Sequence, residues 1–208
     1  DSVGTDLTVV NSARVSLGKC KETLEEDDKK LIKYLIRNKH TSTLEHCFVT
    51  FRVKVPLFVR SQHHRHRTWS YNEISRRYTD FNIEFYEPKA FRTQHSNNRQ
   101  ASNSNELINP ILNEADKDLP GFGEWTWEYS VADAVVEHHK ESLRLFENLI
   151  KSGVCREQAR GILPQNMLTE YYASANFNNI LKFIDLRTHE GAQWEIQEVA
   201  KAMLNIIL

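Results

Sequence analysis

The residues best suited to chemistry are concentrated in one short segment, residues 60–78. This segment contains five arginines and three histidines but a single acid, Glu73, so its formal charge is +4, whereas the whole chain carries −1. Arginine binds phosphate through paired N–H donors, and serine hydroxyls or turn amides can add to such contacts. Composition alone leaves two interpretations open, a site for an anionic ligand and a solvated basic face. The arginines and serines concerned are Arg60, Arg65, Arg67, Ser70, Ser75, Arg76 and Arg77.

Other chemistries fit this segment less well. His63, His64 and His66 could suggest a metal site, but adjacent histidines on a helix point about 100° apart and no acid-rich motif lies nearby, so we predict no metal. Ser75 could be a nucleophile, yet no general-base motif accompanies it, so we expect it to bind an anion. The pair His189-Glu190 does not form an HExxH motif.

The composition of the whole chain excludes several classes of protein. Its 208 residues are 40% apolar and include 4 Trp, 7 Tyr and 10 Phe, which predicts a folded core. With 7 Gly and 5 Pro the chain is neither collagen-like nor of low complexity. Three scattered cysteines without a CxxC pair favour reduced thiols and a cytoplasmic location. No membrane span or signal peptide is recognised, and we expect neither membrane nor nucleic-acid partners.

The spacing within the basic segment resembles the signature of the flavin-dependent thymidylate synthases. Arg65-His66-Arg67 is followed after seven residues by Ser75, and Arg77-Tyr78 comes next. The resemblance extends over nearly the whole chain outside residues 92–124. The further segments that carry it are residues 13–16, 40–46, 156–164, 186–187 and 192–196.

The resemblance implies an enzyme that converts dUMP to dTMP. Methylenetetrahydrofolate supplies the carbon and FAD, reduced by NADPH, supplies the hydride. It also implies a homotetramer with shared active sites, and an α+β fold with a mostly antiparallel sheet flanked by helices. The absence of a GxGxxG motif agrees with a flavin-binding fold that is not of the Rossmann type.

Two alternatives to this enzyme stay open. The first is a non-catalytic nucleotide or single-strand nucleic-acid binding protein, in which Trp69, Tyr71 and Tyr78 would stack on bases. The second is a flavoprotein of the same fold that has lost methyl transfer.

For dUMP, the resemblance implies contacts from several segments, and Arg187 is the predicted catalytic residue. A fixed cation beside the uracil ring would stabilise the negative charge that builds on the pyrimidine. Arg76 stands where many members have a small residue, so we expect its backbone N–H to act rather than its side chain. The implied dUMP-binding residues are Gln62, Arg65, Ser75, Arg76, Arg77, Arg160 and Arg187.

For FAD, the resemblance implies a larger set. Asn178 stands where some relatives carry Arg, and Lys182 where some carry Asn. Glu45 by itself would be a surface acid, and Arg14 is either an ion-pair partner or a support for the site. The implied FAD-binding residues are His40, Ser42, Glu45, Arg65, His66, Arg67, Asn72, Glu73, Asn176, Asn178 and Lys182.

The elements that must position these residues follow from apolar periodicity. Alternation predicts strands over 48–55 and 81–86, and a further strand is expected near 168–175. A helix should begin after Pro56 and run through residue 67, and residues 70–80 should form a loop. Helical spacing and caps predict further helices over 23–38 (capped by Thr23 with Glu26), 125–152, 155–162, 176–187 and 191–206.

The mixture of helices and strands lacks regular βαβ alternation, which favours an α+β fold. Residues 92–118 are rich in Asn and Ser, and we expect a surface excursion with a short helix near 107–112. The predicted organisation is a single domain over residues 1–208 with a polar insertion at about 92–124.

Overall fold

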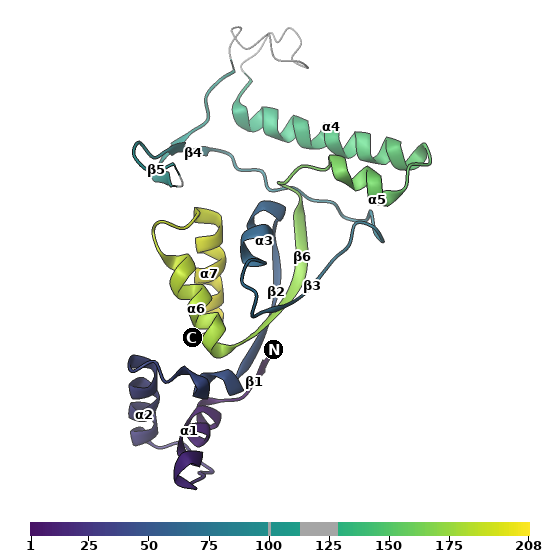
Figure 1. The fold of residues 1–208 in the computed structure, drawn as a ribbon. Helices are drawn as coiled ribbons and strands as arrows, with labels where there is room; N and C mark the ends of the chain where they lie inside the picture. The colour runs from purple at the N-terminus through teal and green to yellow at the C-terminus, as the bar shows by residue number, and fades with distance from the viewer. Residues whose placement is uncertain (100, 113–128) are drawn as a thin grey trace. The chain divides into compact units, whose positions relative to one another are not determined.

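A computed structural model describes residues 1–99, 101–112 and 129–208. Its main sheet has the strand order β1-β2-β6-β3, in which β1 pairs with β2 and β3 pairs with β6, both antiparallel (Figure 1). A separate antiparallel hairpin joins β4 and β5. The strands are β1 (Ser2–Val3), β2 (Phe48–Pro56), β3 (Ser70–Glu73), β4 (Phe91–Gln94), β5 (Ser102–Ile108) and β6 (Leu168–Asn176). The prediction of an α+β fold is confirmed.

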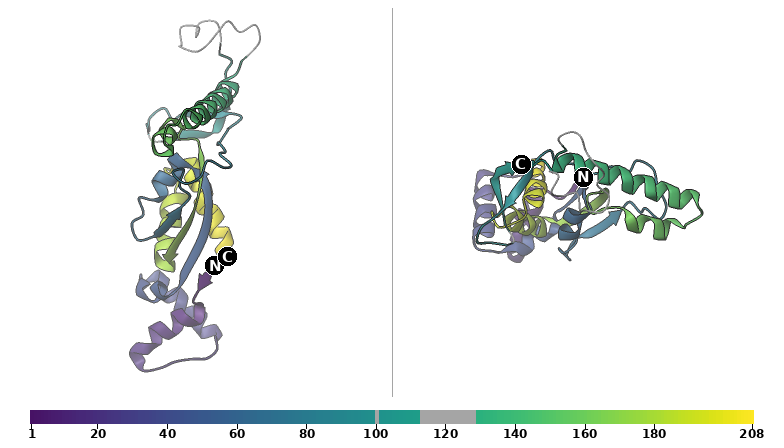
Figure 2. Two further views of the ribbon diagram at one scale, coloured as in Figure 1. Left: turned by 90° about the vertical axis from the view of Figure 1, so that its right-hand side faces the viewer. Right: turned by 90° about the horizontal axis from the view of Figure 1, so that it is seen from above.

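Helices alternate irregularly with these strands. The α-helices are α1 (Asp6–Arg14), α2 (Glu26–Arg37), α3 (Leu57–His63), α4 (Val131–Lys151), α5 (Arg156–Ala159), α6 (Phe177–Thr188) and α7 (Trp194–Ile207). Short 3-10 helices are η1 (Val15–Leu17), η2 (Thr41–His46) and η4 (Arg160–Ile162). Helices α6 and α7 pack against each other, as two further views also show (Figure 2).

The chain divides into two compact units. The first unit comprises Asp1–Val53, Ser61–Glu73 and Glu170–Leu208, and the second comprises Lys54–Arg60 and Ile74–Thr169. In the first unit, α1, η2 and α2 enclose an apolar cluster that includes Val9, Leu35 and Leu44. In the second, α4, α5 and η4 pack together around Phe146 and Ala159. The single domain with a polar insertion stays a prediction.

Several predicted elements are confirmed by their burial. Phe51, Val53 and Val55 of β2 are buried whereas Arg52 and Lys54 are exposed, as the alternation predicted. Strand β6 and helices α5, α6 and α7 lie close to their predicted positions, whereas α3 begins at Leu57 as predicted but ends at His63 rather than at residue 67. The predicted helix over 125–152 is observed from residue 131 onward, and residues 125–128 of that prediction lie outside the described residues.

Three predictions are wrong, each for a physical reason. Residues 81–86 form no strand, because Asn82 adopts a left-handed backbone (φ +54°) and only Phe85 makes an isolated bridge, to Met167. The helix expected near 107–112 is absent, since Leu107 and Ile108 pair with β4 and Pro110 disfavours helical backbone in the residue before it. The start of the predicted loop over 70–80 is β3, whose four residues all pair with β6.

The start of α2 also differs from its prediction. Its capping box is formed by Glu25 and Asp28, not by Thr23 and Glu26. Because the Asp28 carboxylate accepts the Glu25 N–H at 3.0 Å, the helix begins at Glu26.

Candidate functional site

The turn that follows α3 carries the basic motif of the first unit, and aromatic side chains hold it in place. His63, at the end of α3, is buried, and its Nδ1 lies 2.9 Å from the hydroxyl of Tyr171 on β6. The rings of Trp69 and Phe183 lie 4.7 and 4.6 Å from its ring. Burial, aided by nearby cationic groups, lowers the pKa of His63 to about 3, so this imidazole is neutral at physiological pH.

Tyr71 ties the same turn to β3. Its hydroxyl lies 2.8 Å from the carbonyl oxygen of His63 and 3.1 Å from that of His66, and its one proton can donate to either. Burial raises the pKa of Tyr71, so it remains a protonated donor. Tyr71 therefore holds the backbone of the turn at both His63 and His66.

The fixed turn brings His66 to Arg187, in the last turn of α6. Arg187 Nε donates to His66 Nε2 at 3.2 Å. Because a guanidinium can only donate, His66 Nε2 must be unprotonated, and the proton of the neutral ring lies on Nδ1. Burial and the Arg187 charge lower the pKa of His66, and burial lowers the pKa of Arg187. The pair therefore consists of a neutral acceptor and a half-buried cation of fixed orientation.

A second pair of predicted residues meets beside the start of α6. Asn178 is buried, and its side-chain amide donates to Glu45 of η2 at 2.9 Å. Asn176 is the N-cap of α6, since its side-chain oxygen accepts the Asn179 N–H at 2.9 Å. Of the whole FAD set, those exposed to solvent are His40, Ser42, Glu45, Arg65, Arg67, Asn72 and Lys182.

The first unit also joins Gln62 to residues for which no role was predicted. Gln62 donates to the side-chain oxygen of Gln193, and Gln193 donates to Glu195 at 2.8 Å. The sequence signal for them was weak: both lie in the family-like segment 192–196, but neither belongs to the basic motif.

The other predicted dUMP residues lie in the second unit. Arg76 is buried, and its guanidinium donates to the carbonyl oxygens of Phe81 at 2.7 Å and Asn82 at 3.4 Å. These two bonds tie the Arg76 side chain to its own loop. The backbone N–H of Arg76 therefore remains the group that is expected to bind dUMP. Arg77 and Arg160 are exposed. The structure therefore divides the predicted substrate residues between two units.

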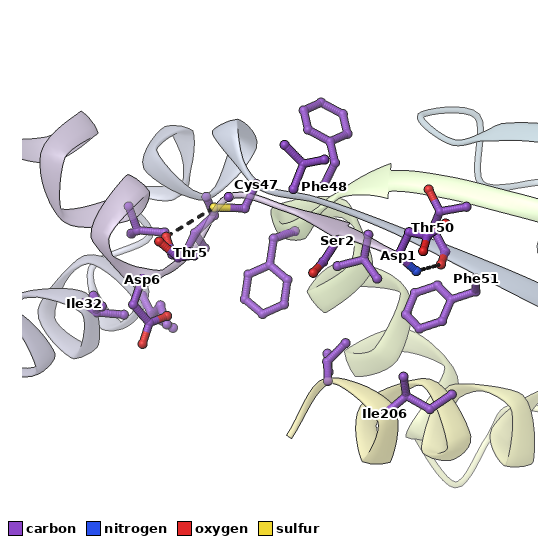
Figure 3. A pocket seen from close by; sticks show the side chains of 18 residues that line it. Asp1, Ser2, Thr5, Asp6, Ile32, Cys47, Phe48, Thr50, Phe51 and Ile206 are labelled. Carbon is purple, nitrogen blue, oxygen red and sulfur yellow. Dashed lines mark hydrogen bonds between the residues drawn. The ribbon is translucent and has the colours of Figure 1, made fainter. Parts of the chain in front are cut away.

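The first unit also contains a pocket whose lining includes none of these residues. Its volume is about 410 Å³, and it is lined by the start of the chain, β2, and the ends of α2 and α7 (Figure 3). The lining is mainly apolar, with Phe48, Phe51 and Ile206 among its side chains, and it includes no arginine or histidine. We place the site at the basic motif instead, because a phosphorylated ligand needs cationic donors.

Two further findings concern only the residues that the structure describes. No helix among them has both the length and the apolar character needed to cross a membrane. No three His, Cys, Asp or Glu side chains among them gather in a way that could hold a metal ion. Arg14 of α1 forms an ion pair with buried Asp28 at 2.6 Å. Of the two roles considered for Arg14, an ion-pair partner or a support for the site, the structure shows the ion pair.

Known proteins resemble this chain over its whole length. The family model Thy1, described as thymidylate synthase complementing protein, matches residues 1–208. A flavin-dependent thymidylate synthase of Thermus thermophilus is 39% identical over 207 residues, covering 100% of this chain and 69% of the relative. That of Thermosipho africanus is 35% identical over 206 residues, covering 99% of this chain and 82% of the relative.

Solved structures agree with these relatives. The UMP/dUMP methylase PolB from Streptomyces cacaoi, bound with 5-Br dUMP, has a TM-score of 0.77 and 29% identity, covering 100% of this chain and 87% of that one. The same protein bound with 5-Br UMP has a TM-score of 0.74, and 85% of that chain is covered. The sequence motif, the fold and these matches agree, and the chain belongs to the Thy1 family of flavin-dependent thymidylate synthases.

Proposed function

We propose that this protein catalyses the reductive methylation of dUMP to dTMP, with methylenetetrahydrofolate as carbon donor, FAD as cofactor and NADPH as reductant. Its relatives are named flavin-dependent thymidylate synthases, and its structural neighbour is a UMP/dUMP methylase. The observation that carries the proposal is the bond between Arg187 and neutral His66, beside the exposed arginines of the motif. This arrangement offers a fixed cation to a nucleotide base and further cations to phosphates.

Arg187 is the proposed catalytic residue. Negative charge must build on the pyrimidine before its C5 can attack the one-carbon donor, and a cation beside N3 and the neighbouring carbonyls stabilises that charge. Because Nε is bound by His66, the two terminal nitrogens are the groups left to face the base. The partial burial of Arg187 strengthens its interaction, since charges attract more strongly away from water.

The proposed phosphate contacts lie in the second unit. Ser75, the backbone N–H of Arg76, and the side chains of Arg77 and Arg160 would hold the dUMP phosphate, and Arg65 of the first unit is a further proposed dUMP contact. Charge-assisted hydrogen bonds of this kind contribute roughly 1.5–3 kcal/mol each. We also propose a homotetramer in which subunits share these residues, and light scattering of the purified protein tests that assembly.

The donor set of the first unit fits FAD. Exposed Arg65 and Arg67 offer cationic donors for a diphosphate, exposed hydroxyl, carboxylate and amide groups lie on η2 and β3, and the exposed amine of Lys182 lies on α6. When bound, FAD supplies the reducing hydride. The residues that would hold it are His40, Ser42, Glu45, Arg65, His66, Arg67, Asn72, Glu73, Asn176, Asn178 and Lys182.

An anaerobic assay tests the proposal. The purified protein, supplemented with FAD, should show a flavin spectrum that NADPH bleaches, and adding dUMP with methylenetetrahydrofolate should yield dTMP. UMP is run in parallel because the structural neighbour is named a methylase of both nucleotides.

The alternatives give different results in the same assay. NADPH oxidation without dTMP indicates a flavoprotein that has lost methyl transfer. A colourless protein with salt-sensitive affinity for oligonucleotides indicates a nucleic-acid binding protein.

A further inference from the structure

One ion pair joins the two short segments of the second unit that carry the proposed phosphate contacts. The guanidinium of Arg156, the first residue of α5, donates to Asp80 Oδ2 at 2.8 Å, and both side chains are 44% exposed. Asp80 closely follows residues 75–77 in the chain, and Arg160 comes one helical turn after Arg156. The pair therefore links the loop over residues 75–82, which we call the phosphate loop, to the segment that contains Arg160.

Hydrogen bonds within the phosphate loop tie Asp80 to the groups proposed to bind phosphate. The Thr79 N–H donates to the Ser75 carbonyl oxygen at 3.2 Å, which closes a turn directly before Asp80. The Arg76 guanidinium donates to the Phe81 carbonyl oxygen at 2.7 Å, directly after Asp80. Asp80 thus lies between two bonds that lead back to Ser75 and Arg76. A contact that places Asp80 also places the Ser75 hydroxyl and the Arg76 backbone N–H.

The helical side of the ion pair is equally well defined. The Arg160 N–H donates to the Arg156 carbonyl oxygen, so the two residues are one α-helical turn apart and their side chains leave the same face. Arg156 and Arg160 are exposed, whereas Ala159 between them is buried. Because Arg156 reaches Asp80, the exposed face that carries Arg160 is also the face that meets the phosphate loop.

We propose that Asp80 and Arg156 are positioning residues that set the spacing between the phosphate loop and Arg160, so that both hold the same phosphate. This assignment rests on the proposed function, in which Ser75, Arg77 and Arg160 bind the dUMP phosphate. An exposed ion pair stabilises a fold only slightly. It raises affinity in another way, because donors already fixed at the right separation lose less freedom when the ligand binds.

The sign of one substitution separates positioning from simple electrostatics. Asp80→Asn removes a negative charge from beside an anion site, which by charge alone should strengthen dUMP binding. If Asp80 positions the site, dUMP should instead bind about 2- to 5-fold more weakly, the size expected for one partly exposed ion pair. KM should rise by a similar factor while kcat changes little, since the phosphate is held equally before and during the reaction. Affinity is measured by calorimetry on the flavin-loaded protein.

Glu84→Gln is the matched control. Glu84 pairs with Lys54 at 2.7 Å in the same unit, and the exposure of this pair is similar to that of Asp80 and Arg156. Burial lowers the pKa of Arg76, and the carboxylates of Asp80 and Glu84 both oppose that shift, so each acts on the charge of the phosphate loop. Because Lys54 lies on β2 and not beside Arg160 in the chain, Glu84→Gln should bind dUMP at least as tightly as wild type does.

Two comparisons locate the loss of affinity. Deoxyuridine, which lacks the phosphate, should compete with dUMP for wild type and Asp80→Asn with equal inhibition constants. In the Arg156→Gln background the ion pair is already absent, so adding Asp80→Asn should cause no further loss of dUMP affinity.

Several results would overturn the assignment. Asp80→Asn that binds dUMP as tightly as wild type or more tightly would contradict positioning by the ion pair while leaving the proposed function standing. The same holds for an equal loss with deoxyuridine, an equal loss in Glu84→Gln, or a further loss in the Arg156→Gln background. Wild-type protein that binds no dUMP would overturn the proposed function and this assignment together.

Discussion

The bond between His66 and Arg187 predicts how activity depends on pH. Protonation of His66 removes the acceptor at Nε2 and places a second cation 3.2 Å from Arg187 Nε. Because burial and Arg187 lower the pKa of His66 below its usual value near 6.5, this protonation occurs only on the acid side of that value. Losing a hydrogen bond to a charged group costs about 1.5–3 kcal/mol, which predicts a fall in kcat/KM of roughly 10- to 150-fold at low pH.

Two variants distinguish the effect of the hydrogen-bond acceptor at residue 66 from the effect of protonating His66. His66→Gln keeps a neutral oxygen acceptor in reach of Arg187, so kcat/KM should be sustained at acid pH, where that of wild type falls. His66→Leu has no acceptor, so kcat/KM should be lower than wild type by the same roughly 10- to 150-fold at neutral pH. The assay is dTMP formation between pH 5 and 8.5, with each rate divided by the bound flavin measured from its absorbance, because His66 is also a proposed FAD contact.

An exposed histidine supplies the control. His138 lies on α4 in the second unit, and His138→Gln makes the same chemical change away from the site. Its pH profile should match wild type. If His66→Leu retained both the rate and the acid limb of wild type, the positioning of Arg187 by His66 would be refuted.

Two further predictions concern stability. Buried Asp28 contacts Arg14 at 2.6 Å and Lys21 at 2.8 Å, so Asp28→Asn should lower the midpoint of urea unfolding, whereas Asp27→Asn in an exposed pair should not; equal midpoints for the two variants would contradict this. His63 has its pKa lowered to about 3 in the folded chain, so below its unfolded value near 6.5 the unfolded chain binds a proton that the folded chain does not. Its contribution to stability should therefore be lost as the pH falls, by up to about 1.4 kcal/mol per pH unit, and His63→Phe should flatten the dependence of stability on pH between 6.5 and 4.

Much of the fold was predictable because apolar residues recur at regular spacing within its buried helices and strands. The alternation in β2 and the helical spacing in α4 and α7 arise because each of these elements buries one face, a pattern that can be read from the sequence alone. The elements that failed depend on other forces. The polar hairpin of β4 and β5 has little alternation to read, and the strand predicted over 81–86 is prevented by the left-handed backbone of Asn82.

The site was predictable in its residue types but not in its contacts. Fixed spacing indicated the basic motif, yet the bond from Arg187 to His66 joins residues 121 positions apart and depends on how α6 lies beside the turn. The hydrogen bond from the Arg76 side chain to the Phe81 carbonyl could not be predicted, because it depends on how the loop folds and no sequence motif specifies that. Gln193 and Glu195 were overlooked because hydrogen bonds of side-chain amides carry no spacing signature.

The most direct test of the central claim is the turnover of Arg187→Ala in the anaerobic assay, with dTMP and bound flavin measured in the same sample. Removing a preorganised cation that stabilises developing charge should lower kcat by roughly 100- to 1000-fold, while flavin content stays near that of wild type. A variant that forms dTMP at the wild-type rate would contradict the catalytic role of Arg187, and wild-type protein that forms no dTMP would contradict the proposed function itself.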